Sequence, residues 1–147
     1  MIYKDQEGHP LNNFYSKIYR RYDRINRIFT FGLDRKWRKI SARECYKSSP
    51  KNIIDLCCGT GDMTVEIAKQ SESTTVIYGY DFNDKMLMVA DEKLRKLGYN
   101  KIKLLQGDVA AMPFQKGEFE CATIAFGFRN LTFENPTADR NVLEISR

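Results

Sequence analysis

The sequence lacks any long apolar run. No segment approaches the roughly 20 consecutive apolar residues that a membrane-spanning helix needs. The N-terminus, which reads MIYKDQEGHPLNN, is polar and lacks the hydrophobic stretch of a signal peptide. We therefore expect a cytoplasmic protein that does not span a membrane.

Histidine and cysteine, the usual zinc ligands, are also scarce. His9 is the only histidine, and the four cysteines form no C-x-x-C pair. A structural zinc site and a Cys-His hydrolase both need such residues close together, so the sequence predicts neither, and no metal site. Cys57 and Cys58 are adjacent in an apolar run, which is typical of reduced, buried thiols.

What is present fits a globular domain of ordinary size. The chain has 147 residues, of which 42% are hydrophobic and 29% are charged. Its net charge of +5 is unevenly distributed, because residues 1–50 hold 12 Lys and Arg against 5 Asp and Glu, whereas residues 51–147 hold 12 against 14. The basic first part is either a solvated helical surface or a segment attracted to anionic membrane or to nucleic acid.

The first 50 residues have helical periodicity. Large apolar side chains recur three or four positions apart, at Tyr15, Ile18, Tyr22, Ile25 and Ile28. We expect one helix over residues 14–28 and a second that begins with Asp34 as its N-cap and runs toward Cys45. The Ser-Ser-Pro at 48–50 is a break, so we predict an N-terminal helical lid or substrate segment (1–50) and a core domain (51–147).

After residue 50, short apolar runs alternate with helical patterns. The runs predict strands over residues 52–57, 75–80, 101–106 and 120–126, and the patterns predict helices over 62–70, 83–97 and 137–147. Asn83 is the expected N-cap of the middle helix, and Gly98 is expected to end it. This alternation predicts an α/β fold with a parallel sheet and right-handed crossovers.

Glycines and acids follow three of these strands. Gly59-Thr60-Gly61 follows the first strand, Asp81 ends the second, and Asp108-Val109 follows the third. Position 64 is a threonine, so the third glycine of a dinucleotide-binding turn is missing, and no G-K-[ST] segment suggests a triphosphate site. A carboxylate at the end of the second strand can accept both hydroxyls of a ribose, although each acid alone could be a helix N-terminal residue. Together, at the carboxyl ends of neighbouring strands, they indicate an adenosine-containing ligand.

These residues resemble the class I S-adenosylmethionine-dependent methyltransferases. Within that class the chain is similar to the ubiquinone/menaquinone biosynthesis C-methyltransferases over about residues 15 to 147. The resemblance rests on YDRIN at 22–26, WR at 37–38, DLCCGTGD at 55–62, GYDF at 79–82, MPF at 112–114 and FGFRN at 126–130.

The resemblance implies a ligand and roles for particular residues. It implies S-adenosylmethionine as cofactor, with contacts from Gly59, Thr60, Gly61, Asp81, Asp108 and Val109. It implies that Tyr22 and Arg129 act at the acceptor, where they favour the phenolate of a hydroquinone. From the residues alone, Tyr22 could equally be a packing residue of its helix, and Arg129 could belong to a structural ion pair.

The resemblance also implies a reaction, namely C-methylation of a polyprenyl (hydro)quinone, such as demethylmenaquinol to menaquinol or the equivalent ubiquinone-pathway step. Since such acceptors reside in membrane, we expect transient contact of the basic segment with the inner membrane face. Methylation of another small molecule and a non-catalytic cofactor-binding fragment remain open. Nucleic acid is not expected, because residues 51–147 lack a basic track.

The resemblance finally implies a Rossmann-like sheet of seven strands in the order 3-2-1-4-5-7-6. The sequence contains only the first four of these strands, so the C-terminal strands 5-7-6 are expected to be absent. We therefore expect an exposed edge on the fourth strand, which favours pairing with another chain and leaves a homo-oligomer open.

Overall fold

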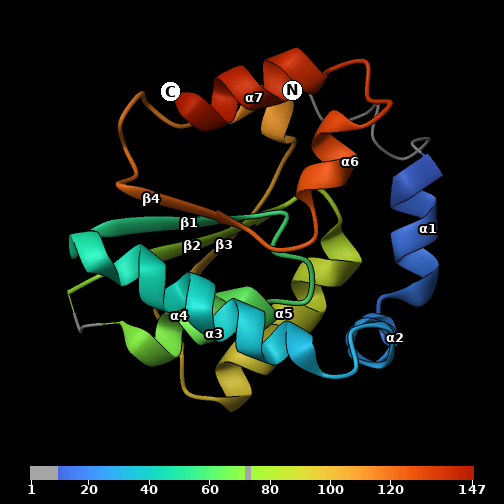
Figure 1. The fold of residues 1–147 in the computed structure, drawn as a ribbon, viewed down its shortest axis with the longest axis horizontal. Coiled ribbons are helices and arrows are strands. Elements are labelled where there is room, and N and C mark those ends of the chain that lie inside the picture. Colours follow the sequence, from blue (N-terminus) through green and yellow to red (C-terminus); the bar gives the residue numbers. More distant parts are fainter. Residues whose placement is uncertain (1–9, 72–73) are drawn as a thin grey trace.

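The structure, a computed structural model that describes residues 10–71 and 74–147, contains a four-stranded parallel sheet (Figure 1). The strands are β1 (Asn52–Leu56), β2 (Val76–Asp81), β3 (Lys103–Gln106) and β4 (Cys121–Ile124). They lie in the order β3-β2-β1-β4, with β1 paired to both β2 and β4. The expected α/β fold with strand order 3-2-1-4 is therefore confirmed.

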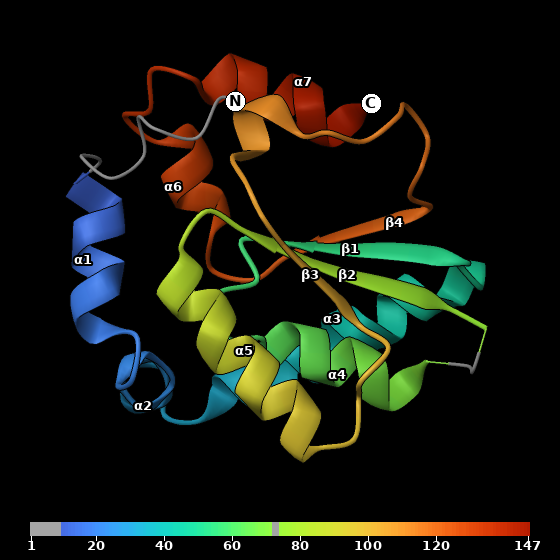
Figure 2. The ribbon, with the colours of Figure 1, turned by 180° about the vertical axis from the view of Figure 1, so that it is seen from behind.

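The helices cover both faces of this sheet. They are α1 (Pro10–Ile18), α2 (Tyr22–Phe29), α3 (Leu33–Cys45), α4 (Asp62–Gln70), α5 (Asp84–Lys96), α6 (Phe128–Thr132) and α7 (Ala138–Ser146), with 3-10 turns η1 (Tyr46–Ser48) and η2 (Val109–Ala111). Figures 1 and 2 show α3, α4 and α5 on one face of the sheet and α7 on the other. The prediction that concerned His9 lies outside the described residues.

The single helix expected over residues 14–28 is wrong, because a turn at residues 19–21 divides it into α1 and α2. The two helices run in different directions in Figure 1. The spacing of apolar residues by three or four positions continues across this turn, because α1 and α2 each contribute an aromatic ring to one contact. The rings of Tyr15 on α1 and Tyr22 on α2 meet edge to face, with their centroids 5.8 Å apart.

Asp34 does not cap α3, contrary to expectation. The N-cap position is Gly32, whose φ of 78° is in the left-handed region that glycine adopts readily. Asp34 is fully buried in the first turn of α3 and forms an ion pair with Arg38 one turn later. The Arg38 guanidinium and a hydrogen bond from Thr30 outweigh the effect of burial and hold the pKa of Asp34 below its ordinary value.

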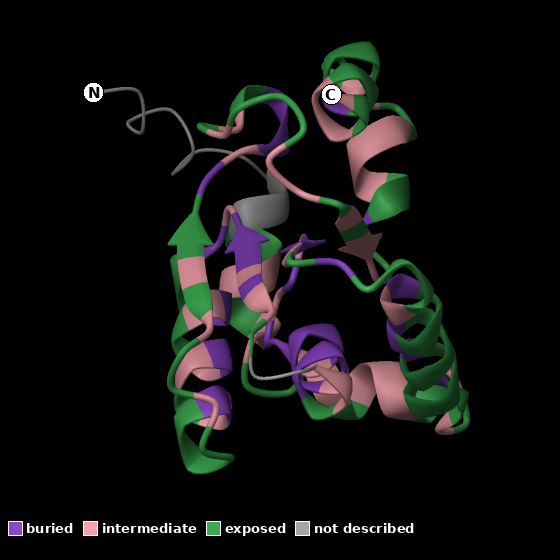
Figure 3. Cartoon of the chain, turned by 90° about the vertical axis from the view of Figure 1, so that its left-hand side faces the viewer, coloured by how far each residue is buried: buried purple, intermediate pink, exposed green. Residues whose placement is uncertain are grey.

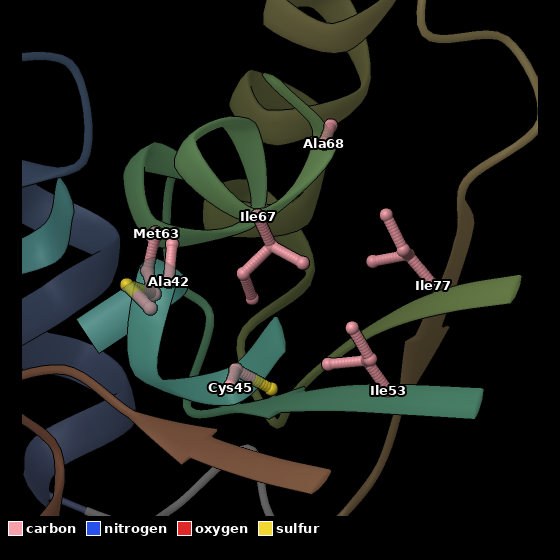
Figure 4. Packing of buried hydrophobic residues seen from close by; sticks show 7 residues of the cluster. All are labelled: Ala42, Cys45, Ile53, Met63, Ile67, Ala68 and Ile77. Carbon is pink, nitrogen blue, oxygen red and sulfur yellow. The ribbon is translucent and has the colours of Figure 1, made fainter. Parts of the chain in front are cut away.

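The core consists of one apolar cluster on each face of the sheet, because neighbouring strand residues point in opposite directions. Ile53 packs with residues of α3 and α4, whereas Ile54 packs on the opposite face with Tyr80 and Val109. Figure 4 shows the first cluster, whose members are Ala42, Cys45, Ile53, Met63, Ile67, Ala68 and Ile77. Buried residues occupy the sides of the helices that face the sheet (Figure 3). Since Ala42 and Cys45 belong to this cluster, α3 packs as part of the sheet domain.

The cysteines divide into one disulfide and two free thiols. Cys57 and Cys58 are free, as predicted, but of the two only Cys58 is buried, whereas Cys57 is partly exposed. Cys45 at the end of α3 and Cys121 in β4 form a disulfide that is not among the predictions from sequence. The two are 76 positions apart, so no local pattern indicates the pairing. The bridge covalently joins the N-terminal helical segment to the sheet.

Gly107, just after β3, is the tightest glycine position of the core. A Cβ added there would lie 1.9 Å from the hydroxyl oxygen of the fully buried Tyr80. We expect Gly107→Ala to lower the free energy of unfolding by about 2–3 kcal/mol, because the buried ring cannot move away without strain. Denaturant unfolding measures this loss. In a Tyr80→Phe background, which removes the nearest atom but leaves ring carbons at 2.5 and 2.9 Å, Gly107→Ala should cost less than it does in the parent chain. An equal cost in both backgrounds would argue against a clash with the hydroxyl.

Candidate functional site

A cavity lies at the carboxyl ends of the strands. Of the predicted site residues, those that line it are Tyr22, Gly59, Asp81, Asp108 and Val109. The structure therefore brings together residues from α2, from the turn after β1, and from the ends of β2 and β3. Thr60, Gly61 and Arg129 do not line this cavity. In open α/β sheets this edge is where ligands bind.

The turn after β1 has the backbone conformation that its glycines predict. Gly59 and Gly61 have φ values of 54° and 80°. A Cβ at Gly61 would lie 3.0 Å from the Cβ of Ala90, so this glycine also allows α5 to approach the turn closely. Two other residues that line the cavity, Cys57 and Phe126, have φ values of 53° and 65°. Left-handed backbone is costly for such side chains and is concentrated at functional sites.

Asp81 is the central acid of the cavity. Its side chain accepts hydrogen bonds from the backbone N–H groups of Gly59 (2.8 Å) and Asn83 (2.9 Å). Burial raises the pKa of Asp81 to about 6, against these hydrogen bonds. The backbone N–H of Phe82 also hydrogen-bonds to this carboxylate, and of its about four lone-pair positions at least one remains for a ligand. Asp81 can therefore accept a hydrogen bond from a ligand hydroxyl, such as that of a ribose.

Protonation of the buried acids Asp81 and Asp55 should change ligand binding and folding stability in opposite directions. As pH falls, we expect binding to weaken and the ligand-free chain to become more stable. Burial raises the pKa of each to about 6 in the folded chain, whereas in the unfolded chain it returns toward its ordinary value of 3.8. As pH falls below about 6, Asp81 becomes protonated, so we expect the affinity for a ligand that donates hydroxyl hydrogen bonds to its carboxylate to fall by up to about tenfold per pH unit. Calorimetric titration between pH 5 and 7 measures this, and a flat profile would contradict it.

The stability of the ligand-free chain should change in the other direction. Between the two pKa values the folded state holds protons that the unfolded state has lost, so stability falls as pH rises through this window and levels off above about pH 6. We expect a higher denaturation midpoint at pH 5 than at pH 7. Asp55→Asn removes one of the two responsible groups and should flatten this profile without flattening the profile for binding.

Asp55 itself has a structural position. It is fully buried at the end of β1 and does not line the cavity. Its two oxygens accept hydrogen bonds from the hydroxyls of Thr64 (2.6 Å) and Thr123 (2.9 Å). Asp55 therefore joins β1 to α4 and β4 and holds the turn that follows it in place.

Thr60 faces the N-terminal helices rather than the cavity. It is buried, and its hydroxyl donates a hydrogen bond to Asp23 of α2. Asp23 also accepts from Lys93 of α5 at 2.8 Å, and Lys93 in turn pairs with Asp62 at the start of α4. This network of Asp23, Thr60, Lys93 and Asp62 holds α2 over the glycine turn, where Tyr22 comes within 4.0 Å of the Cβ position of Gly59.

Asp108 and Val109 shape the far side of the cavity. The Asp108 carboxylate accepts a hydrogen bond from the backbone N–H of Ala110 at 2.9 Å and so caps η2. Val109 is buried and packs with Tyr80 in the second core cluster. The predicted pair thus presents a carboxylate next to an apolar surface, as an adenine edge requires.

An aromatic end of the cavity was only partly predicted. Tyr15 lines it beside Tyr22, and the Tyr15 hydroxyl accepts a hydrogen bond from the side-chain amide of Asn130 at 2.7 Å. Burial raises the pKa of both tyrosines, so each is a neutral phenol at neutral pH. Neither Tyr15 nor Asn130 is among the predicted site residues, although Tyr15 is in the helical stripe and Asn130 ends the FGFRN segment.

Arg129 lies apart from the other candidates. It is exposed on α6, and its guanidinium carbon lies 4.8 Å from the centre of the Phe133 ring. Its neighbours Phe128 and Asn130 differ in position, since Asn130 lines the cavity while Phe128 is 53% exposed. The structure therefore brings Tyr22 to the cavity and leaves Arg129 outside it, on the exposed surface of α6.

Within residues 10–71 and 74–147, which the structure describes, no three His, Cys, Asp or Glu side chains are grouped closely enough to hold a metal ion. No helix within these residues has the length and apolar character needed to cross a bilayer.

Solved structures share this fold. A crystal structure of an S-adenosyl-L-methionine-dependent methyltransferase from Methanococcus maripaludis superimposes with a TM-score of 0.73 at 22% identity, covering 89% of this chain and 57% of that one. A crystal structure of an S-adenosylmethionine-dependent methyltransferase from Clostridium acetobutylicum superimposes with a TM-score of 0.68 at 20% identity, covering 91% and 51%. At such identities the likeness shows the fold.

Sequence relatives are more specific. The chain is 34% identical over 128 residues to a demethylmenaquinone methyltransferase of Bacillus subtilis and 35% identical over 127 residues to a ubiquinone/menaquinone biosynthesis C-methyltransferase of Geotalea uraniireducens. These alignments cover 87% and 86% of this chain but 55% and 54% of the relatives, so the chain spans about half the length of the relatives it matches. The model of the ubiE/COQ5 methyltransferase family matches residues 2–145. This chain therefore belongs to the ubiE/COQ5 methyltransferase family.

Proposed function

We propose that the chain binds S-adenosylmethionine at the glycine turn and takes part in C-methylation of a polyprenyl (hydro)quinone ring, as in the step from demethylmenaquinol to menaquinol. The observation that carries the proposal is the cavity itself. One cavity is lined by Gly59, Asp81 and Asp108, which we call its cofactor end, and by Tyr15 and Tyr22, which we call its acceptor end. The two groups adjoin, because Tyr22 comes within 4.0 Å of the Cβ position of Gly59. A cofactor and a flat aromatic acceptor therefore have adjoining surfaces.

The cofactor end is inferred from its carboxylates and its apolar surface. Asp81 would accept the ribose hydroxyls, and Asp108 with Val109 would take the adenine. Gly59 and Gly61 give the turn its shape, while Thr60 links the turn to Asp23. When bound, the cofactor supplies a sulfonium methyl group that is already activated for transfer. The chain's own task is to align the acceptor carbon and to exclude water.

The acceptor end is assigned from its aromatic and amide groups. Tyr15 and Tyr22 present two phenols in edge contact, and Asn130 fixes the Tyr15 hydroxyl. A hydroquinone ring carbon becomes nucleophilic when the neighbouring hydroxyl loses its proton. Because burial raises its pKa, Tyr22 remains protonated and can donate a hydrogen bond to the resulting phenolate.

Arg129 is proposed to stabilise the same phenolate by its charge. It is one residue before Asn130 and three residues after Phe126, both of which line the cavity. A long side chain on the exposed surface of a short helix can turn from the Phe133 ring toward a bound acceptor. Catalytic contacts commonly tighten only when the substrate is bound.

The experiment combines binding with turnover. Calorimetry should detect S-adenosylmethionine but not NAD, and a radiolabelled methyl group should pass to reduced demethylmenaquinone and not to a nucleic acid. Binding of NAD instead would overturn the methyltransferase assignment. Binding of S-adenosylmethionine with no transfer to this quinol or to demethylated ubiquinone precursors would identify a different small-molecule acceptor or a cofactor-binding piece of a longer enzyme.

A further inference from the structure

The connection between α2 and α3 carries a group of exposed apolar side chains. Ile28 is 68% exposed, Phe29 81%, Phe31 94% and Leu33 47%, and these four residues, which we call the apolar turn, fall within six positions of the chain. Single exposed apolar residues are common on protein surfaces, but a local group of this size is typical of an interaction site. Figure 1 shows the connection at the periphery of the molecule, away from the sheet.

The apolar turn has a defined conformation. The Thr30 hydroxyl donates to the carbonyl of Asn26 at 2.8 Å, and the Gly32 N–H donates to the carbonyl of Arg27 at 2.9 Å. Phe31 has a φ of 50°, which is costly for a phenylalanine. This conformation is therefore maintained although it leaves the Phe31 ring almost wholly in solvent.

The charges around the apolar turn are of one sign. Residues 20–40 contain eight Lys and Arg and two Asp. Both acids are engaged inside the molecule, since Asp34 is buried against Arg38 and Asp23 binds Lys93 of α5. The cations that remain exposed are Arg20, Arg21, Arg24, Arg35, Lys36 and Lys39.

We propose that the apolar turn and its exposed cations dock on the surface of an anionic lipid bilayer. The phenyl and aliphatic side chains would enter the boundary between headgroups and acyl chains, and the cations would face lipid phosphates. A nucleic acid would use the cations but would leave Ile28, Phe31 and Leu33 without apolar partners. A second copy of the chain would bring two cationic surfaces together, which opposes pairing.

Docking at this place would also position the cavity. Phe29 ends α2 and Tyr22 begins it, and a helix of this length spans about 12 Å. The aromatic end of the cavity would therefore lie about one short helix from the lipid surface. Such an arrangement would help catalysis only if the proposed function holds, since a polyprenyl acceptor resides in the bilayer. The docking itself depends only on the apolar turn and its exposed cations.

Vesicle flotation of the full chain tests the docking. We expect binding to vesicles of phosphatidylcholine with phosphatidylglycerol and little binding to phosphatidylcholine alone. Phe29→Ser/Phe31→Ser should lower the partition coefficient at least about tenfold, because both rings lose their burial in lipid. Arg35→Gln/Lys36→Gln should lower it about tenfold, and only on the anionic vesicles.

A matched control exists on α6 and its C-terminus. Phe128 and Phe133 are 53% and 57% exposed, so Phe128→Ser/Phe133→Ser removes the same kind of side chain from α6 and its C-cap and should leave flotation unchanged. Equal loss in this control, or no flotation of the unaltered chain, would overturn the proposal. Association of the unaltered chain into a dimer that Phe29→Ser/Phe31→Ser disrupts, without vesicle binding, would overturn it as well.

Cofactor binding separates this proposal from the proposed function. Calorimetry with S-adenosylmethionine is expected to give the same affinity for the unaltered chain and for Phe29→Ser/Phe31→Ser, which also shows that the variant is folded. If flotation fails while cofactor binding and methyl transfer to a detergent-dispersed quinol persist, the docking is refuted and the proposed function stands. If flotation depends on the apolar turn while methyl transfer is absent, the docking stands alone.

Discussion

Asp81→Ala is expected to weaken S-adenosylmethionine binding about 100-fold or more. The substitution removes a buried carboxylate at the centre of the cofactor end, together with its hydrogen bonds to the N–H groups of Gly59 and Asn83. Charge-assisted hydrogen bonds to a ligand contribute about 1.5–3 kcal/mol each, and a ribose hydroxyl would donate such a bond to this carboxylate. The dissociation constant from calorimetric titration is the quantity to compare.

The effect must be separated from a loss of structure, since Asp81 also supports the glycine turn. Asp84→Ala is a suitable control, because Asp84 is an exposed acid three positions later in the first turn of α5. It should leave the dissociation constant within about twofold. Thermal unfolding of both variants reports their stability. Unchanged affinity in a folded Asp81→Ala chain would remove Asp81 from the site.

Arg129→Ala is expected to lower the rate of methyl transfer about 100-fold while leaving S-adenosylmethionine affinity within about twofold. A positive charge that acts only on the phenolate affects the transition state and contributes little to cofactor binding. The comparison of kcat with the cofactor dissociation constant distinguishes this role from a structural one.

Two further variants sharpen this experiment. Arg140→Ala removes an exposed arginine from α7 and should change neither quantity. Arg129→Lys keeps the charge and should retain more activity than Arg129→Ala. If Arg129→Ala lowers transfer and cofactor binding equally, the arginine acts through the structure of α6 and not on the acceptor.

The sheet could be predicted from sequence because its signals are local. Each strand is a short apolar run, and each following helix begins at a glycine, an acid or Asn83, whose side chain accepts from the Met86 N–H as a cap should. The cofactor end follows from the same order, since the carboxyl ends of parallel strands meet at one edge. Gly59, Asp81, Asp108 and Val109 therefore line one cavity although they are spread over 51 positions of the chain.

The parts that could not be predicted depend on contacts between distant segments. The turn between α1 and α2 leaves the apolar spacing unbroken, so periodicity cannot reveal it. Asp34 has the residue type and position of an N-cap, but burial beside Arg38 determines its role. Asn130 and Tyr15 are 115 positions apart, and only the fold shows that one binds the other.

The weak attachment of α2 has a consequence for exchange with solvent. None of its residues is fully buried, and besides the edge contact of Tyr22 with Tyr15 its ties to the rest of the chain are polar, chiefly those of Asp23 with Thr60 and Lys93. A helix with so little buried surface can open locally at a small fraction of the free energy needed to unfold the sheet. Its amide hydrogens should therefore exchange long before those of α4, and ligands can enter and leave beneath it while the core remains folded.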